Sequence, residues 1–181
     1  CFVRYDAYAT QLYAIDLPTG QSRLLSTLGS DTPFLYNDVE AHSDGSYCYA
    51  KITGELGTAT PDGVETPLYQ GSYTIADDSG FRPFYIRSAA GALYTYDYWD
   101  AALYQVKDGA LSRPDWQGEV AFEKDVSELN SSGGTVVGIS NGQPWAAENG
   151  TVTALPDSAS LSVARTAGFL VLLLLHGCAI P

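Results

Sequence analysis

The sequence predicts an all-β fold made of four consecutive antiparallel sheets, each about 43 residues long. A turn that ends in glycine recurs at Gly20, Gly63, Gly109 and Gly150, each time between segments rich in Leu, Val, Tyr and Thr. The spacings between these glycines are 43, 46 and 41 residues. A period of about 40–45 residues is that of one propeller blade, a small sheet that buries its faces against its neighbours. We therefore expect four β-propeller blades over residues 1–157.

Within each unit we expect a strand, a turn rich in Ser, Asp and Gly, a second strand, the recurring glycine turn and a third strand. The second unit shows the pattern most clearly, with a turn at 41–46 and a strand at 47–52. The corresponding turns of the next two units are 87–92 and 130–134. The chain has 18 Gly, nine Pro and 13 Tyr among 181 residues. This composition favours short strands joined by tight turns over a helical bundle.

Two segments resemble the blade units of bacterial β-propeller repeat proteins. Residues 12–20, Leu-Tyr-Ala-Ile-Asp-Leu-Pro-Thr-Gly, are similar to the strand-turn consensus of quinoprotein-like propellers. Residues 43–46, Ser-Asp-Gly-Ser, are similar to the turn of TolB-like units. The resemblance covers residues 2–157 and implies the fold only. The tryptophan-docking positions that mark quinone-binding blades are not visible in this sequence, so the resemblance implies no cofactor.

The number of units leaves the closure of the ring open. Four-bladed propellers exist, but rings of roughly six to eight blades are commoner, so the four blades are either a complete ring or part of a larger one. The tail, residues 158–181, departs from the repeat. Its apolar run of nine residues, 167–175, is shorter than the ~20 that a membrane-spanning helix needs. We expect a closing strand or a short core helix there, and the alternative is a processed lipid-anchor signal beginning at residues 158–160.

The chain is strongly acidic, with 21 acidic residues, nine basic residues and a net charge of −12. Proteins that bind nucleic acid neutralise phosphates with cationic side chains, so this balance argues against a nucleic-acid partner. It argues equally against electrostatic attraction to an anionic membrane. We expect a well-solvated acidic surface.

The three cysteines and two histidines do not follow a recognised metal-binding spacing, so we expect no metal. Cys1 and Cys178 stand at opposite ends of the sequence, which a closed propeller brings together. A disulfide between them is therefore one alternative, and free buried thiols, with Cys48 among them, are the favoured one. His42 is expected to be a solvent-facing residue of its turn.

No nucleophile or phosphate-binding motif points to an enzyme. The sequence contains neither a Gly-x-Ser-x-Gly elbow nor a Walker-type phosphate loop. Carboxylates do occur in pairs, at 77–78, at Asp97 with Asp100 and at Glu123 with Asp125. Glycosidases use two carboxylates at a set separation, but such pairs also arise by chance in an acidic chain. A carboxylate-based glycosidase or lyase of propeller fold is therefore the alternative function.

The best candidate binding site is the aromatic segment 94–100, Tyr-Thr-Tyr-Asp-Tyr-Trp-Asp. As a strand it places its three tyrosines on one face, and Trp99 and Asp100 then lie at or near the following turn. Tyrosine and tryptophan side chains either pack between blades or supply rigid contact area for a protein or a sugar. We take Tyr98, Trp99 and Asp100 as the candidate binding residues.

These observations predict a non-enzymatic β-propeller module that binds or scaffolds a protein or carbohydrate partner. In propellers, ligands meet loops that a rigid scaffold carries. We expect no catalytic residue, no cofactor and no membrane-spanning segment. We expect the protein to be bacterial and to be secreted or located in the cell envelope.

Overall fold

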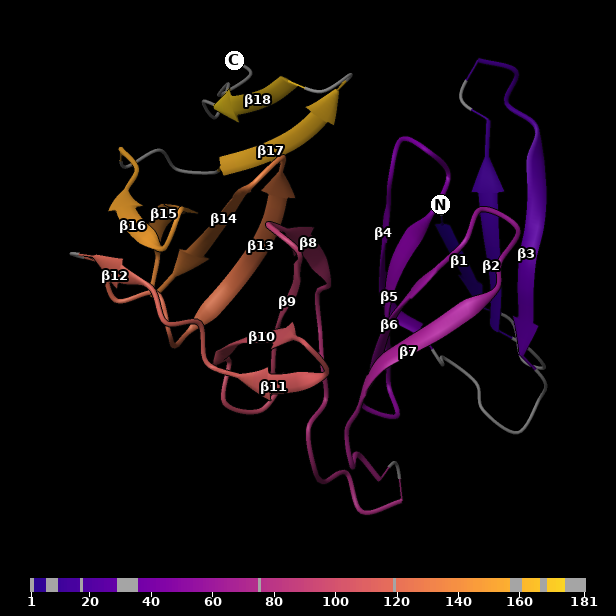
Figure 1. The fold of residues 1–181 in the computed structure, drawn as a ribbon, viewed down its shortest axis with the longest axis horizontal. Coiled ribbons are helices and arrows are strands. Elements are labelled where there is room, and N and C mark those ends of the chain that lie inside the picture. Colours follow the sequence, from indigo (N-terminus) through magenta and orange to yellow (C-terminus); the bar gives the residue numbers. More distant parts are fainter. Residues whose placement is uncertain are drawn as a thin grey trace, which may run out of the picture.

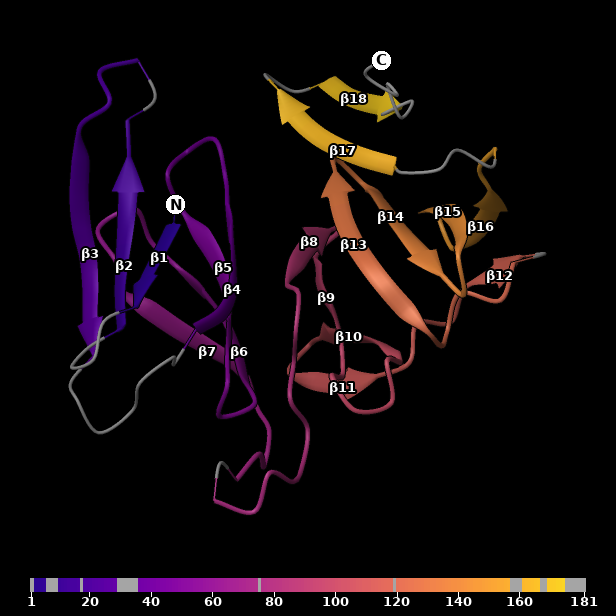
Figure 2. The same ribbon diagram turned by 180° about the vertical axis from the view of Figure 1, so that it is seen from behind.

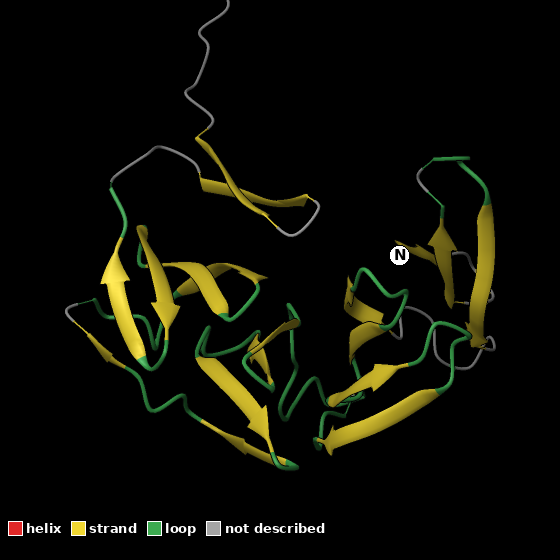
Figure 3. Cartoon of the chain, turned by 45° about the horizontal axis from the view of Figure 1, so that its top comes forward, coloured by secondary structure: helices red, strands yellow, loops and turns green. Residues whose placement is uncertain are grey.

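The computed structural model describes residues 2–5, 10–16, 18–28, 36–74, 76–118, 120–156, 161–166 and 169–174. Strands occupy much of this part of the chain, and it contains no helix. The sheets follow one another around an open arc (Figure 3). The all-β prediction is confirmed, as are the consecutive antiparallel sheets.

The first two sheets are antiparallel throughout and keep their strands in chain order. The first sheet consists of β1 (Phe2–Tyr5), β2 (Thr10–Ile15) and β3 (Ser22–Leu28). The second sheet consists of β4 (Tyr36–Ala41), β5 (Tyr47–Lys51), β6 (Glu55–Ala59) and β7 (Glu65–Gln70). Both are labelled in Figure 1.

The third and fourth sheets repeat this order further along the chain. The third sheet consists of β8 (Arg87–Ala89), β9 (Ala92–Tyr96), β10 (Leu103–Lys107) and β11 (Ala110–Ser112). The fourth sheet consists of β13 (Val126–Ser132), β14 (Thr135–Ser140), β15 (Gln143–Glu148) and β16 (Thr151–Ala154). The short strand β12 (Gln117–Gly118) adds to its outer edge, parallel to β16.

The described part of the tail is a hairpin. Its strands β17 (Leu161–Thr166) and β18 (Phe169–Leu174) pair antiparallel with each other. β17 lies against β13, the first strand of the fourth sheet (Figure 2). The apolar run of the tail thus contains a strand where we expected a strand or a short helix. The division of the chain at residue 157 stays a prediction.

The recurring glycine turns join the last two strands of each of the four sheets. They are Gly20 between β2 and β3, Gly63 between β6 and β7, Gly109 between β10 and β11, and Gly150 between β15 and β16. In Asp108–Gly109 and Asn149–Gly150 both residues have positive φ, 52° and 77° in the first turn and 50° and 79° in the second. Positive φ at both central residues defines the type I′ hairpin turn, which favours Asn or Asp followed by Gly.

The unit has one strand more than we expected. Three strands were predicted per unit, but the second, third and fourth sheets each have four strands in meander order. The strand that we missed lies between the expected second strand and the recurring glycine turn, and a further turn leads into it. These further turns are at Gly54, at 97–102 and at Asn141–Gly142. The first two have no Asn-Gly or Asp-Gly pair, and the pair in the third was not counted.

Among the side chains that the structure describes, the hydrophobic core consists of three clusters, one between each pair of neighbouring sheets from the first to the fourth. The cluster between the first two sheets is built on tyrosines. The next, between the second and third sheets, is built on small and aliphatic residues around Leu56, Ile86 and Leu93. The last, between the third and fourth sheets, contains Trp145 and Phe122. Each sheet is therefore buried by its neighbours, as the blades of a propeller are.

The first strands of the sheets line the inner side of the arc. β1 lies against β4, β8 against β13, and β13 against β17. Hydrogen bonds link β4 to the segment that enters β8, because the Asp38 carboxylate accepts from the Ile86 amide at 3.0 Å. This inner row brings side chains of three sheets to one place.

Candidate functional site

The predicted binding residues Tyr98, Trp99 and Asp100 lie in the loop between β9 and β10, and one buried carboxylate fixes the shape of this loop. Asp97 is 6% exposed and accepts hydrogen bonds from the backbone amides of Arg82 at 2.8 Å and Trp99 at 2.9 Å. The amide of Tyr98 in turn donates to the carbonyl of Arg82 at 2.9 Å. Asp97 therefore ties this loop to the connection between the second and third sheets. The loop is a rigid platform.

Two of the predicted residues project from this platform. Tyr98 is 46% exposed and Trp99 is 49% exposed. Their rings meet edge to face, with centroids 5.0 Å apart. The guanidinium of Arg82 lies 4.7 Å from the centroid of the Tyr98 ring, within the range of a cation–π contact. The result is an exposed cluster of two aromatic rings and one cation. We name these three residues, Tyr98, Trp99 and Arg82, the Tyr98–Trp99 cluster.

The third predicted residue, Asp100, is held by the loop itself. One oxygen of its carboxylate accepts from the Ala102 amide at 2.9 Å. The other accepts from the Tyr104 hydroxyl and from the Arg113 guanidinium, both at 3.3 Å. Asp100 is thus oriented beside the Tyr98–Trp99 cluster, with its side chain about half exposed.

The earlier tyrosines of the segment belong to the core. Tyr94 is 5% exposed and Tyr96 is 7% exposed, and both pack in the cluster between the third and fourth sheets. Tyr94 contacts Trp116 with ring centroids 5.1 Å apart. The packing interpretation therefore holds for the strand, and the binding role of the loop residues stays a prediction.

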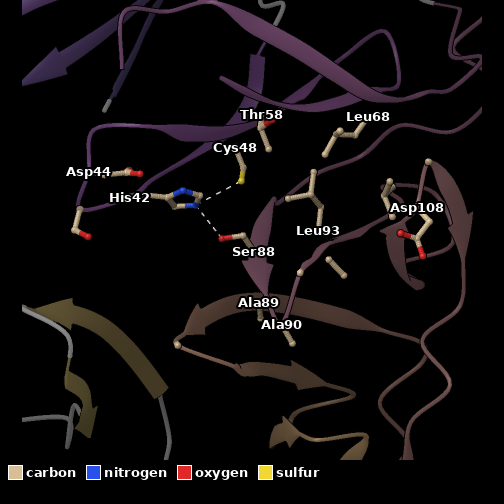
Figure 4. Close-up of a pocket in the computed structure, with 16 residues that line it drawn as sticks. His42, Asp44, Cys48, Thr58, Leu68, Ser88, Ala89, Ala90, Leu93 and Asp108 are labelled. Atoms are coloured by element: carbon tan, nitrogen blue, oxygen red, sulfur yellow. Dashed lines mark hydrogen bonds between the residues drawn. The ribbon is translucent and has the colours of Figure 1, made fainter. Parts of the chain in front are cut away.

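A pocket of about 720 Å³ lies at the opposite end of the same strands. From the second sheet, His42 and Cys48 line it, and from the third sheet the turns Ala90–Gly91 and Asp108–Gly109 do (Figure 4). Consecutive strands of an antiparallel meander run in opposite directions. The turns at 90–91 and 108–109 are therefore at one end of the third sheet, and the 97–102 loop is at the other.

A hydrogen-bonded network surrounds His42 at the wall of this pocket. Its Nδ1 lies 3.1 Å from the Ser46 hydroxyl, which donates its proton to Asp44 at 2.6 Å. Its Nε2 lies 2.9 Å from the Ser88 hydroxyl, which donates to a Glu40 oxygen at 2.7 Å. Because both hydroxyls donate to carboxylates, each is free to accept from the facing ring nitrogen of His42. The network thus favours the imidazolium form of the ring.

The pKa values of His42 and Glu40 agree with this protonation of the ring. The hydrogen bond to Cys48 and then the one to Glu40 raise the pKa of His42 to about 10, against the opposing effect of burial. Burial alone would raise the pKa of Glu40, but hydrogen bonds from His42, Ser131 and Ser88 outweigh it and lower that pKa. The site therefore combines a carboxylate and a cationic imidazole beside the Cys48 sulfur.

Glu40 connects three inner strands. Its Oε1 accepts from the Ser131 hydroxyl of β13 at 2.6 Å, and its Oε2 accepts from the Ser88 amide of β8 at 2.7 Å. Its own strand is β4, and its side chain is 9% exposed. A single carboxylate thus holds the second, third and fourth sheets together where they meet.

The structure corrects our expectation for His42. We expected a solvent-facing turn residue, but its side chain is only 26% exposed and sits within the network. The sequence did carry a signal for this site. Glu40 and Cys48 are cross-strand partners in the β4–β5 hairpin and therefore share a face of the sheet. Cys48 is a free, buried thiol, as favoured, whereas Cys1 and Cys178 lie outside the described residues.

The carboxylate pairs do not assemble into a glycosidase site in the described pocket. The Asp97 carboxylate accepts from the backbone amides of Arg82 and Trp99. The pocket wall carries Asp44 and Asp108, which lie at opposite ends of it in Figure 4. Hydrogen bonds from the Ser46 side chain and amide lower the pKa of Asp44. A glycosidase acid needs a raised pKa, so Asp44 is unsuited to that role.

Comparison with known proteins identifies the architecture. A chain of the nidogen/laminin complex is similar to this one with a TM-score of 0.55 and 12% identity, over 84% of this chain and 59% of that one. Virginiamycin B lyase from Staphylococcus aureus is similar with a TM-score of 0.51 and 13% identity, over 82% of this chain and 48% of the lyase. The fold is that of a β-propeller. The chain spans about half of the length of these propellers, and at such low identity the likeness concerns the fold alone.

The sequence itself matches no protein-family model and none of the curated proteins compared with it. Within the described residues, no helix has the length and apolar character to cross a membrane. The β-propeller fold that the glycine turns predicted is nevertheless supported by the solved structures.

Proposed function

We propose that this β-propeller chain is a binding module that recognises a protein partner through the Tyr98–Trp99 cluster. The single observation that carries the proposal is the exposure of two aromatic rings on a loop that a buried carboxylate fixes. Tyr, Trp and Arg are the residue types most enriched at the energetic centres of protein interfaces. Here Tyr98, Trp99 and Arg82 occur together.

The rigidity of the loop supports this role. A loop that is ordered before binding loses little conformational entropy when a partner arrives. Asp97 holds the loop from within, and Asp100 holds its far side through Ala102, Tyr104 and Arg113. The carboxylate of Asp100 also adds hydrogen-bond acceptors at the edge of the cluster.

The ring geometry favours a protein over a carbohydrate. Sugar rings stack on a flat aromatic face, whereas the planes of Tyr98 and Trp99 are 86° apart. The two rings therefore form a corner, which suits the irregular surface of a protein. Of the two solved propellers reported above, one comes from a protein–protein complex. The secreted or cell-envelope location expected from the sequence is part of this proposal.

The test uses a displayed peptide and protein-domain library beside a glycan array, both probed with the full chain. We expect ligands in the library, and Trp99→Ala should weaken their binding by more than ~1 kcal/mol, roughly fivefold or more in Kd. Val64, 59% exposed in the turn between β6 and β7, supplies the matched control. Val64→Ala should leave the affinity unchanged.

Three results would overturn the proposal. Ligands found only on the glycan array would reassign the partner to carbohydrate. Equal losses in Trp99→Ala and Val64→Ala would remove the site from this loop. Unfolding of Trp99→Ala, without a separable loss of affinity, would place Trp99 in the core of the sheets.

A further inference from the structure

The second site of the molecule is the group of Glu40, His42 and Cys48, at the other end of the sheets from the Tyr98–Trp99 cluster. One ligand atom from each of the three side chains lies within 4.8 Å of the others. The His42 Nε2 is 3.4 Å from the Glu40 Oε2 and 3.5 Å from the Cys48 Sγ. Around a tetrahedral zinc ion, with bonds of about 2.0–2.3 Å, such ligand atoms are separated by about 3.3–3.6 Å. The two measured separations fall in this range.

We propose that Glu40, His42 and Cys48 bind a zinc-class divalent ion at the wall of the pocket. Thiolate and imidazole are ligands for zinc and its borderline relatives, whereas calcium and magnesium take oxygen ligands. We expected no metal from the sequence, because the three residues do not follow a linear zinc motif. The β4–β5 hairpin brings them together instead.

The surroundings of the three side chains are those of a metal site. Metal-bound histidines commonly use their second ring nitrogen to hold a hydrogen bond that orients the ring. Here the His42 Nδ1 contacts the Ser46 hydroxyl, which is held by Asp44. The Ser131 hydroxyl occupies the Glu40 Oε1 and so directs the Oε2 toward His42.

The pocket supplies access and a fourth position. His42, Cys48 and Ser88 all line it, so an ion reaches two of the three ligands through this cavity (Figure 4). The third, the Glu40 Oε2, lies 3.4 Å from the His42 Nε2. The Ser88 hydroxyl lies 2.9 Å from the His42 Nε2. It therefore turns aside or takes the fourth position when the ion binds. Three protein ligands with one exchangeable position are typical of open zinc sites.

Binding exchanges protons for the ion. The Cys48 thiol loses its proton to become a thiolate, and the His42 imidazolium loses the proton of its Nε2. Both protons go to solvent, and the ion takes their place between the ligand atoms. No bond to carbon changes, and no oxidant or reductant is needed.

The test is spectroscopic and uses the full chain with Cys1→Ser and Cys178→Ser, so that Cys48 is its only thiol. Cobalt(II) serves as the coloured substitute for zinc. We expect a near-ultraviolet sulfur-to-cobalt charge-transfer band and strong visible bands of tetrahedral geometry, which one equivalent of zinc abolishes. The band reports the Cys48 sulfur directly, without a variant that has to fold. Absence of the band in a folded protein would overturn the proposal.

Variants then identify the ligand set. Cys48→Ser should lose the charge-transfer band, and His42→Gln should weaken cobalt binding at least tenfold. Thr58→Ala is the matched control, because Thr58 lines the same pocket and is not one of the proposed ligands. It should keep the band and bind within about threefold of the parent. Loss of binding in Thr58→Ala with retention in His42→Gln would refute the ligand set. These results are independent of the Tyr98–Trp99 cluster.

Discussion

The interface between the second and third sheets differs in kind from the interface between the third and fourth. The first is built on small and aliphatic side chains, among them Cys48, Ala50 and Ile86, and polar groups cross it at its inner edge. The second is aromatic, with Phe122 and Trp145 packed against Tyr94 and Tyr96 of the third sheet. The two interfaces flank the same sheet.

This difference between the two interfaces explains where the larger cavity of the molecule lies. Small side chains cannot fill the space between two blades that diverge from the axis, so the larger cavity opens beside Cys48 and Leu93. On the other side, large rings leave a smaller cavity of about 260 Å³. Gly138 belongs to that tight packing, because a Cβ there would come within 2.3 Å of the Trp145 ring. A site thus forms where packing is sparse and polar groups remain to face the gap.

The largest effect is expected in the aromatic interface. Trp145 is fully buried and donates a hydrogen bond from its indole to the Ser140 hydroxyl at 2.8 Å. Trp145→Ala should lower the free energy of unfolding by about 4 kcal/mol, through lost burial and the cavity that remains. Urea denaturation measures this. Trp99→Ala is the matched control, and it should cost less than about 0.5 kcal/mol because Trp99 is exposed. Similar losses in both variants would contradict the contrast.

The polar interface should depend most on Glu40. Glu40→Ala removes the acceptor of Ser88 and Ser131 and the partner of His42. Breaking such a buried arrangement from one side should cost about 3 kcal/mol at pH 7, measured by urea denaturation without added metal. Glu148→Ala, at an exposed strand position, should cost less than about 0.5 kcal/mol. A Glu40→Ala protein as stable as the parent would show that the sheets need no polar tie.

The smallest effect is expected in the tyrosine cluster between the first two sheets. Burial and the charge of Glu65 raise the pKa of Tyr47 to about 12. Below pH 10 the tyrosine is protonated in both states. Above pH 10 it loses its proton only when the chain unfolds, so stability falls as the pH rises toward 12. Tyr47→Phe should remove up to about 1 kcal/mol per pH unit of this decline.

The same variant makes a second prediction at neutral pH. The Tyr47 hydroxyl is buried and has no hydrogen-bond partner among the described residues. Removing it should therefore raise the stability by up to about 1 kcal/mol. Thermal unfolding at pH 7 and between pH 9 and 11 measures both effects. A destabilised variant with an unchanged alkaline profile would contradict them.

The sequence predicted the parts of the fold that local chemistry decides. Asp108–Gly109 and Asn149–Gly150 need positive φ, which only a few residue types accept, so their turns stand out along the chain. The turn at Gly54 and the 97–102 loop carry no such pair, so the strands that follow them were missed. Asn141–Gly142 does carry the pair, and there we failed to read the turn, which left three strands counted in a unit that has four.

The candidate sites also differ in how far local sequence determines them. Trp99 was found as a loop aromatic because a strand that alternates must end near it. The spacing alone could not tell the exposed Tyr98 from the buried Tyr96, because exposure depends on the fourth sheet, far along the chain. The network of His42 was missed for a similar reason. Ser88, which contacts His42, and Ser131, which contacts Glu40 of the same network, come from other sheets.

The contact between Glu40 and Ser131 has a consequence for the order of folding. It joins residues 91 positions apart, so it forms only after the second, third and fourth sheets have come together. Because closing such long loops costs entropy before the contact is gained, we expect this contact to form late, after the rate-limiting barrier. Replacing Glu40 should therefore leave the refolding rate nearly unchanged and accelerate unfolding. The Glu40 carboxylate therefore sets the lifetime of the folded state, through the unfolding rate, and contributes little to the rate of folding.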